Sequence, residues 1–588
     1  MHAAGEFTTR LDSHYSVDDS GKTHVTQDFQ LQNNLSTVYA AQYALEIGST
    51  QVENVIVTSN GQTLTPTIVP HSNKTSVSFP FSDKVIGKDQ IRSFQVSYDT
   101  RDAAQITGRI LEVNIPKLAN PTEFSSYTVT IDVPIHFGAP TLTQPEQATS
   151  DVSGTHQLVH FTNVGQTNGI SAIFGDEQIA KLSLHYNIEN PKNTTSFTEI
   201  AIPSDTSTQR LYYESIDPQP EILRQDTDGN WLARYTLAGN EKKTILVVGY
   251  ALISKREQTG ENPPQPHDLY SQKYWETTDP KISSLAKNLK DPQSIYDFVV
   301  KTLTYDYRRI DSANARYGAL GALSNPTASV CMEFTDLFIA IARSAGIPAR
   351  EVNGYAYTQN GTLRPISLVR DVLHAWPEYW DSQKKLWIAV DPTWENTTGG
   401  IDYFHHFDFN HIAFVTHSTS STLPLAAGLY KFGDTDSKDI DVSFTNTLPR
   451  QEDHFDITFP TPPTQLLRIH QRATVRIHNA SLHAVYNTPV VVRIFEGGAE
   501  TNQTTTQVTL PPLSDKDLEV VLPQTRLFAT QPLQLQVSSI GKTYTHDLTL
   551  RSVVTTNLPL IAIAALVAGS GLTIIFIAWR LLVPRRKR

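Results

Sequence analysis

The sequence holds a single cysteine, Cys331, among 588 residues. One cysteine excludes a disulfide framework within the chain, so the folded parts depend on their hydrophobic cores. Hydrophobic residues make up 39% and charged residues 18%, a balance typical of globular domains rather than of disordered segments. An isolated cysteine is either a buried, inert side chain or a reactive thiol, and composition alone leaves both interpretations open.

The chain also lacks an excess of positive charge. Its formal net charge is -11, and segment 580–588 alone contributes five cations, so the rest carries -16. An acidic surface repels phosphate backbones, and we therefore expect no nucleic-acid partner. The length predicts roughly three to five domains.

Charged residues are absent from 558–579. A helix of that stretch would be about 33 Å long, enough to cross the hydrocarbon layer of a bilayer. The basic segment 580–588 follows at once, and Lys and Arg accumulate on the cytoplasmic side of membranes. The pattern predicts a single-pass membrane protein with a cytoplasmic C-terminus and the bulk of the chain extracellular. A buried C-terminal core helix is the alternative that needs no membrane.

An apolar run of the kind found in signal peptides is missing from 1–14. The extracellular interpretation therefore predicts a signal segment upstream of Met1, or one removed from this chain. A tail-anchored protein with 1–557 in the cytosol would need no such segment. It would, however, require five cations to cross the membrane against the usual bias.

Alternating apolar and polar positions predict β-structure over much of the chain. The hairpin signal Asn60-Gly61 lies between two such runs, and Asp228-Gly229 predicts a turn entering a strand. The predicted fold class is multidomain, with N-terminal β domains, an α+β core, a C-terminal immunoglobulin-like β-sandwich and a single transmembrane helix. The predicted domains are 6–188, an antiparallel β domain; 189–260, a β-rich domain or extension; 265–425, the α+β core; 440–552, the sandwich; 558–579, the transmembrane helix; and 580–588, a basic cytoplasmic tail.

Helical signals concentrate between 279 and 345. Asp279-Pro280 and Asp291-Pro292 each pair an N-cap residue with proline at the first helical position. Apolar residues recur at helical spacing between 326 and 346, with Ser329 as the predicted N-cap and Gly346 as the stop. The segment 350–415 instead reads as strand-rich.

This arrangement places Cys331 in the first turn of a helix. The unpaired N–H groups and the dipole there favour the thiolate and can hold an oxyanion, which are two requirements of a thiol nucleophile. A base and a group that orients the base are also needed. His374 lies on one predicted strand, and the following strand ends at Asp391. Adjacent strands would bring Asp391 beside His374, and the helix would present Cys331 to the imidazole.

Three blocks, CMEFTDLFIAIARSAGIPAREVNGY, HAWPEYW and WIAVDPTW, resemble the motifs of the transglutaminase-like superfamily in order and spacing. The resemblance covers about 265–420, and segment 226–235 resembles domains that precede this core in membrane-bound prokaryotic members. It implies an α+β papain-like fold in which Cys331 is the nucleophile, His374 the base and Asp391 its orienter. The family includes protein cross-linkers, peptidases and amidases, so it implies the chemistry and leaves the substrate open.

Aromatic and histidine residues near these motifs invite further interpretations. Trp376 and Trp394 are expected to pack or to form walls of a substrate groove, and Tyr305 and Tyr307 are weaker candidates for a groove or an oxyanion donor. His405, His406, His411 and His417 form a cluster in sequence that suggests a metal site, but His405 and His406 are adjacent and no cysteine joins them. Asp408 and His411 also fall in a strand-like stretch, which favours a structural role. We therefore expect neither a metal nor a cofactor.

Two functions follow from these observations. The first is a cell-surface thiol enzyme that acts on a protein or peptide substrate, with water or an amine as the acceptor. The second is a surface binding or adhesion protein in which the thiol domain is a silent scaffold. An intact set of Cys331, His374 and Asp391 favours the enzyme, and the oligomeric state stays open.

Overall fold

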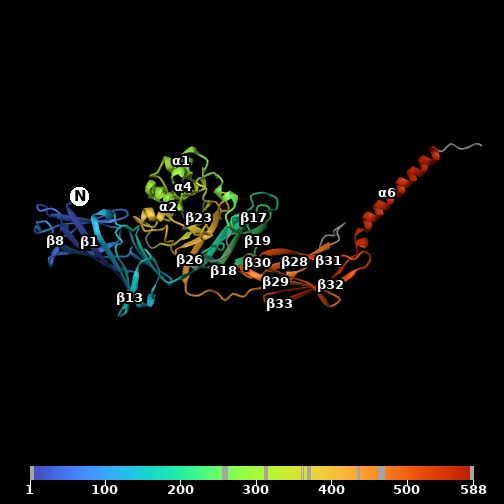
Figure 1. Ribbon diagram of the computed structural model, residues 1–588, viewed down its shortest axis with the longest axis horizontal. Helices are drawn as coiled ribbons and strands as arrows, with labels where there is room; N and C mark the ends of the chain where they lie inside the picture. The colour runs from blue at the N-terminus through green and yellow to red at the C-terminus, as the bar shows by residue number, and fades with distance from the viewer. Residues whose placement is uncertain are drawn as a thin grey trace, which may run out of the picture. The chain divides into compact units, whose positions relative to one another are not determined.

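The computed structural model describes residues 5–167, 169–254, 263–309, 316–358, 361, 363–366, 373–433, 438–460 and 470–582. The chain forms two compact units, one of 1–221 with 225–449 and one of 222–224 with 450–588. Figure 1 shows β-strands through most of the chain, with one cluster of helices in its middle.

The N-terminal part is built on an eight-stranded sheet in the order β13-β14-β11-β1-β2-β8-β4-β5. Its strands are β1 (Phe7–Val17), β2 (Thr23–Asn33), β4 (Val52–Ser59), β5 (Gln62–Leu64), β8 (Ile91–Thr100), β11 (Phe124–Pro134), β13 (Thr149–Ser153) and β14 (His156–Phe161). Strand β2 alternates buried and exposed residues, as expected for a sheet with one face on a core. The predicted hairpin is confirmed, because Asn60 and Gly61 have positive φ and β4 pairs with β5 across them.

The expectation of a purely antiparallel domain is wrong for one pair, since β1 and β11 run parallel. A hairpin forces antiparallel pairing, but these two strands are separated by a long stretch of chain that allows a crossover. Two smaller sheets, β3-β7-β6 and β12-β15-β10-β9, share the core with side chains such as Leu11, Val77 and Leu111. Their strands are β3 (Gln42–Ile47), β6 (Thr67–Pro70), β7 (Thr75–Pro80), β9 (Ala104–Thr107), β10 (Ile110–Ile115), β12 (Pro140–Gln144) and β15 (Ile170–Phe174).

A four-stranded sheet in the order β18-β21-β16-β26 follows. Its strands are β16 (Glu177–Glu189), β18 (Gln209–Asp217), β21 (Lys242–Ser254) and β26 (Ile440–Thr445). Beside them β17 (Ser196–Ile202) pairs with β20 (Trp231–Leu237), and β19 is Ile222–Gln225. The turn predicted at Asp228-Gly229 is confirmed, because Gly229 has a φ of +96° and donates its N–H to Asp226 O just before β20.

The α+β core joins five α-helices to the sheet β24-β23-β22-β25. These elements are α1 (Pro280–Asn288), α2 (Pro292–Thr302), α3 (Gly318–Ser324), α4 (Cys331–Ser344), α5 (Pro392–Thr397), β22 (Ala349–Ala356), β23 (Leu373–Asp381), β24 (Leu386–Ala389) and β25 (His411–His417). The two predicted N-caps are confirmed, since Asp279 accepts from Lys281 N and Asp291 accepts from Ser294 N. Helix α4 packs on β22 and β23 (Figure 1). Short 3₁₀ turns occur at Pro121–Glu123, Ile135–Phe137, Pro266–Leu269 and Tyr307–Arg309.

The second unit contains the sheets β27-β28-β31 and β30-β29-β32-β33. Their strands are β27 (Phe455–Thr458), β28 (His470–Asn479), β29 (Val485–Glu496), β30 (Ala499–Leu510), β31 (Asp515–Gln524), β32 (Gln531–Ser539) and β33 (Lys542–Leu550). Val475, Val490 and Val537 from both sheets meet in one core. Two antiparallel sheets around a common core are compatible with the sandwich, and its immunoglobulin-like character stays a prediction.

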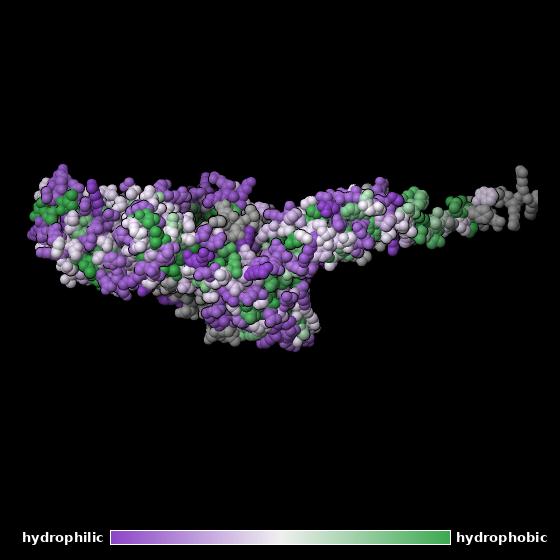
Figure 2. Space-filling view, turned by 90° about the horizontal axis from the view of Figure 1, so that it is seen from below, coloured by the Kyte–Doolittle hydropathy of each residue, from purple (hydrophilic) through white to green (hydrophobic). Residues whose placement is uncertain are grey.

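Helix α6 (Val553–Leu582) ends the described chain. The segment Val553–Ile575 of this helix has a mean hydropathy of 2.3. Among the described residues, α6 is the one helix that is long and apolar enough to cross a membrane. On the face that Figure 2 shows, hydrophobic residues cover the coloured part of this helix, and hydrophilic residues are widespread over the folded part. The helix begins five residues before the predicted span of 558–579, and the orientation of the chain stays a prediction.

Candidate active site

Cys331 is the first residue of α4 and is fully buried. The predicted N-cap, Ser329, is wrong by one residue, because Val330 occupies that position in extended conformation. Glu333 explains the shift, since its carboxylate reaches back and accepts the Val330 N–H at 2.9 Å. Ser329 instead accepts a hydrogen bond at its carbonyl from Asp306 N, which ties the helix start to the preceding loop.

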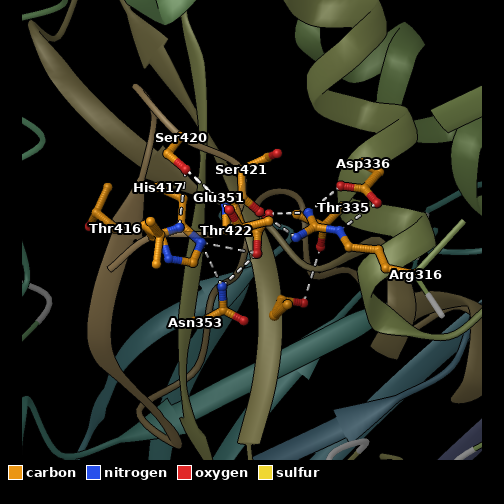
Figure 3. Close-up of polar contacts among 12 residues, drawn as sticks. Arg316, Thr335, Asp336, Glu351, Asn353, Thr416, His417, Ser420, Ser421 and Thr422 are labelled. Carbon is orange, nitrogen blue, oxygen red and sulfur yellow. Dashed lines mark hydrogen bonds and ion pairs between the residues drawn. The ribbon is translucent and has the colours of Figure 1, made fainter. Parts of the chain in front are cut away.

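Buried polar contacts fix α4 on the sheet. Thr335 Oγ1 donates to Ala375 O at 3.2 Å, one residue from His374. Farther along α4, Asp336 accepts the indole N–H of Trp275 at 2.9 Å. Figure 3 shows Arg316 between Asp336 and Glu351, so that one guanidinium links α4 to β22. Because these charges are buried and paired, the helix and the strand hold a fixed relation.

His374 lies near the start of β23, opposite Gly354 of β22. Its Nε2–H donates to Asp391 Oδ2 at 2.9 Å, and both side chains are fully buried. A side chain at position 354 would overlap the carbonyl oxygen of Ile412 and come within 2.8 Å of Trp376 Cη2. Glycine is therefore required where β22 passes the imidazole.

Asp391 is the N-cap of α5, a helix that the prediction of a strand-rich segment at 350–415 did not include. Its Oδ1 accepts the backbone N–H groups of Thr393 at 2.9 Å and Trp394 at 3.1 Å, which leaves Oδ2 for His374. The sequence carried the signal, because Asp391-Pro392 repeats the cap pattern of Asp279-Pro280. The capping bonds fix the carboxylate in the orientation that an imidazole-orienting group needs.

The charges of His374 and Asp391 stabilise each other. Burial lowers the pKa of His374, but the charge and hydrogen bond of Asp391, with smaller contributions from Cys331, outweigh burial and raise this pKa to about 9. Burial raises the pKa of Asp391. The charge and hydrogen bond of His374, with the charge of His411, outweigh burial and hold this pKa well below its usual range. At neutral pH the pair is therefore imidazolium and carboxylate.

The four predicted aromatic residues fall into two groups. Trp394 stacks on the His374 ring with centroids 5.3 Å apart, and Trp376 does so at 6.2 Å. Both indoles are buried and pack against the imidazole rather than lining an open groove. Tyr305 and Tyr307 stack edge to face with each other, and Tyr305 pairs with Ser329 two residues before Cys331. The groove and oxyanion roles stay predictions.

Sequence reasoning missed His411 as part of this site. It assigned His411 a structural role, but the structure places His411 Nε2 3.4 Å from Asp391 Oδ2. Two other histidines of the sequence cluster have different partners: His405 pairs with Asp402, and His417 with Glu351 and Pro424 O. The spacing Asp408-x-x-His411 was visible in the sequence, but the strand order β23-β22-β25 that brings His411 to His374 was not.

The donor atoms of His374, Asp391 and His411 lie within 4.8 Å of one another, a spacing that a metal ion could also use. The pKa of His411, like that of His374, is raised to about 9. Burial lowers the pKa of His411, and the charge of Asp408, its hydrogen bond and the nearby carboxylate of Asp391 outweigh burial. Metal ligation requires neutral imidazoles, so this charge state opposes it and the expectation of no metal stays a prediction.

Comparison with known proteins confirms the resemblance. Residues 276–392 match the model of the transglutaminase-like superfamily. The chain is 30% identical over 127 residues to a protein-glutamine gamma-glutamyltransferase of Pseudomonas aeruginosa, a match that spans 20% of this chain and only 18% of that protein.

Similar solved structures include the following two. A Cytophaga hutchinsonii protein described as a cysteine protease is 18% identical, with a TM-score of 0.30 over 46% of this chain and 89% of that one. Red sea bream transglutaminase is 11% identical, with a TM-score of 0.19 over 63% of this chain and 80% of that one.

Proposed function

Because residues 276–392 are a transglutaminase-like domain, we propose that this chain is a thiol enzyme that cleaves or transfers acyl groups of peptides or amides. In this proposal Cys331 is the nucleophile, His374 the general base and acid, and Asp391 the group that orients His374. The substrate is a protein or peptide, and neither a metal nor a cofactor takes part.

The observation that carries the proposal is the 2.9 Å hydrogen bond between His374 Nε2 and Asp391 Oδ2, beside a cysteine at the first position of a helix. Since Nε2 is used by Asp391, Nδ1 is the ring nitrogen left for the thiol. Among the described residues Nδ1 has no oxygen or nitrogen partner. This is the division of roles that a thiol–imidazole–carboxylate site requires.

The reaction would proceed in two steps. The Cys331 thiolate adds to the carbonyl carbon of the substrate amide, and N–H groups at the start of α4 stabilise the oxyanion. The His374 imidazolium gives its proton to the departing amine as the C–N bond breaks, which leaves a thioester on Cys331 and a neutral imidazole. His374 then takes a proton from water or from a second amine as that acceptor attacks the thioester and releases Cys331.

Hydrolysis and transfer differ only in the acceptor. The name of the Pseudomonas aeruginosa relative describes transfer from protein glutamine, so a glutamine-containing protein with a primary amine is the first pair to test. We further propose that α6 anchors the chain in a membrane with its bulk outside the cell. The substrate would then be an extracellular or envelope protein.

One observation favours the alternative of a silent scaffold, namely the complete burial of Cys331. A substrate or reagent can reach the thiol only after neighbouring structure opens. The test must therefore measure reactivity directly.

Alkylation of Cys331 by iodoacetamide at pH 6–7 tests the proposal, because this is the single thiol of the chain. We expect wild-type Cys331 to react faster than Cys331 in His374→Ala, while His405→Ala, a change at another histidine of the core, keeps the wild-type rate. Turnover of a peptide library with and without a primary amine then assigns the acceptor, and dialysis against EDTA should leave it unchanged. Equal alkylation rates in wild type and His374→Ala, together with no turnover of the peptide library, would show that the thiol domain is a non-catalytic scaffold.

A further inference from the structure

Asp391 has a second buried histidine beside it. His411 begins β25, pairs with Ala356 of β22, and places Nε2 3.4 Å from Asp391 Oδ2. The same oxygen accepts from His374 at 2.9 Å, and the two imidazole centroids are 5.5 Å apart. One carboxylate oxygen thus faces two imidazoles, although only one is needed to build a triad.

Asp408 fixes the ring of His411. The Nδ1–H donates to Asp408 Oδ1 at 2.7 Å, and the two side chains are 0% and 1% exposed. The backbone N–H of Asn410 also donates to Asp408 Oδ1, at 2.9 Å. This bond fixes the conformation of the turn between Asp408 and His411. Because Asp408 occupies Nδ1, Nε2 is the nitrogen that lies near Asp391.

Two indoles restrain the imidazole further. The Trp394 ring lies 4.4 Å from the His411 ring and also stacks on His374, while Trp376 meets His411 edge-on at 4.9 Å. The same aromatic walls therefore orient both histidines. A histidine with a purely structural role in the sheet would not need to contact the same two indoles as the proposed base.

We propose that His411, held by Asp408, is a positioning residue that keeps Asp391 ionised and directed at His374 throughout the reaction. The proposal rests on the proposed thiol chemistry. When His374 gives its proton to the leaving amine, its positive charge disappears while Asp391 stays buried. A buried carboxylate without a cationic partner is costly and tends to take up a proton. His411 supplies that partner, so the proton stays on the reacting groups.

The charged groups that face His411 agree with this role. Asp391 and Asp408 lie close to it, and His374 is the neighbouring imidazole. Burial raises the pKa of Asp408, but the charge and hydrogen bond of His411, with a smaller contribution from Arg364, lower it. His411 therefore sits between two carboxylates, which favours its cationic form while His374 changes charge.

The chain offers a matched control in Asp402 and His405. This pair has the same i,i+3 spacing and a similar Nδ1–carboxylate distance of 2.8 Å. The His405 side chain is 39% exposed and its carboxylate partner is Asp402 rather than Asp391. A change at His405 thus removes an equivalent pair in the same domain without touching Asp391.

The experiment is a double-mutant cycle on the full chain, read out as the rate of Cys331 alkylation by iodoacetamide at pH 7. His411→Phe should slow alkylation about tenfold or more, because small displacements of a catalytic group cost up to about a hundredfold. His405→Phe should change it less than about threefold. In an Asp391→Asn background, His411→Phe should add less than about threefold, since both changes act through one carboxylate. A purely structural role would give effects that multiply.

A second variant keeps the test sound if His411→Phe folds poorly. His411→Gln retains an amide donor near the Nε2 position and should recover part of the rate that His411→Phe loses. The proposal is overturned if His411→Phe reacts as fast as wild type, or if its effect multiplies fully with Asp391→Asn. Failure of the thiol chemistry gives a different result, in which wild type is no faster than His374→Ala.

Discussion

The Glu112 carboxylate of β10 accepts a 3.1 Å hydrogen bond from the backbone N–H of Phe409, across 297 residues of sequence. Its second oxygen lies 3.4 Å from Asn410 Nδ2. Glu112 is 4% exposed, so both contacts are buried. The N-terminal β-structure therefore supports the turn that leads from Asp408 to His411.

This contact predicts that Glu112→Ala slows Cys331 alkylation by about threefold to tenfold without unfolding the core, because the turn carrying His411 loses its acceptor. Glu112→Gln keeps one carbonyl oxygen and should lie closer to wild type. Iodoacetamide kinetics on the full-length chain check both. An alanine variant that reacts at the wild-type rate would mean that the contact joins the two regions without influencing the site.

Asp391→Asn should lower turnover by about 10²- to 10⁴-fold, less than Cys331→Ala does. The amide can still cap α5 through its oxygen, but it favours the wrong imidazole tautomer and cannot stabilise the imidazolium. Steady-state kinetics on the peptide identified with the library provide the measurement, and circular dichroism controls for folding. A variant with wild-type turnover would remove Asp391 from the mechanism.

Stability should fall as pH rises from about 6.5 to 9. The pKa values of His374 and His411 are each raised to about 9, so the folded state binds more protons than the unfolded chain in this window. Their contribution is fully present below the unfolded value of about 6.5 and is lost as pH passes 9. Urea unfolding followed by tryptophan fluorescence checks this, because six of the seven tryptophans precede residue 450. In His411→Gln the decline should be shallower, and an equal decline would exclude His411 as a contributor.

Gly354→Ala should destabilise the core by about 2 kcal/mol or more, since the added methyl group would overlap Ile412 O and press on Trp376. Gly361→Ala is the control, because no atom of the described residues lies within 4 Å of a Cβ there. The same fluorescence assay compares the two. Equal stabilities of both variants would show that β22 can shift away from β25 without cost.

Local patterns predicted the parts of the core that depend on neighbouring residues. The caps Asp279 and Asp291 and the position of Cys331 in the first turn of a helix follow from side chains within four residues. Helix α5 was predictable on the same ground, because Asp391-Pro392 carries the same cap pattern, but the sequence analysis predicts only strands and a turn there.

The remaining features depend on tertiary contacts. His411 reaches Asp391 only because β25 pairs with β22, a strand 55 residues earlier at Ala356↔His411. Glu112 reaches Phe409 only because two separate β-structures pack together. No periodicity or spacing within one segment encodes either contact. The sequence therefore pointed to His411 without its place beside Asp391, and it did not single out Glu112.

The last prediction concerns membrane orientation. Helix α6 is long and apolar enough to span a bilayer, and the five cations of 580–588 predict that the C-terminus stays in the cytoplasm. Protease added to intact cells should then digest the part of the chain that carries Cys331, and an antibody against the basic tail should detect a short protected fragment. Lysed cells provide the control for cleavability. If the intact-cell sample is fully protected while the lysate is cleaved, the chain faces the cytosol. The substrate of the thiol site must then be sought there.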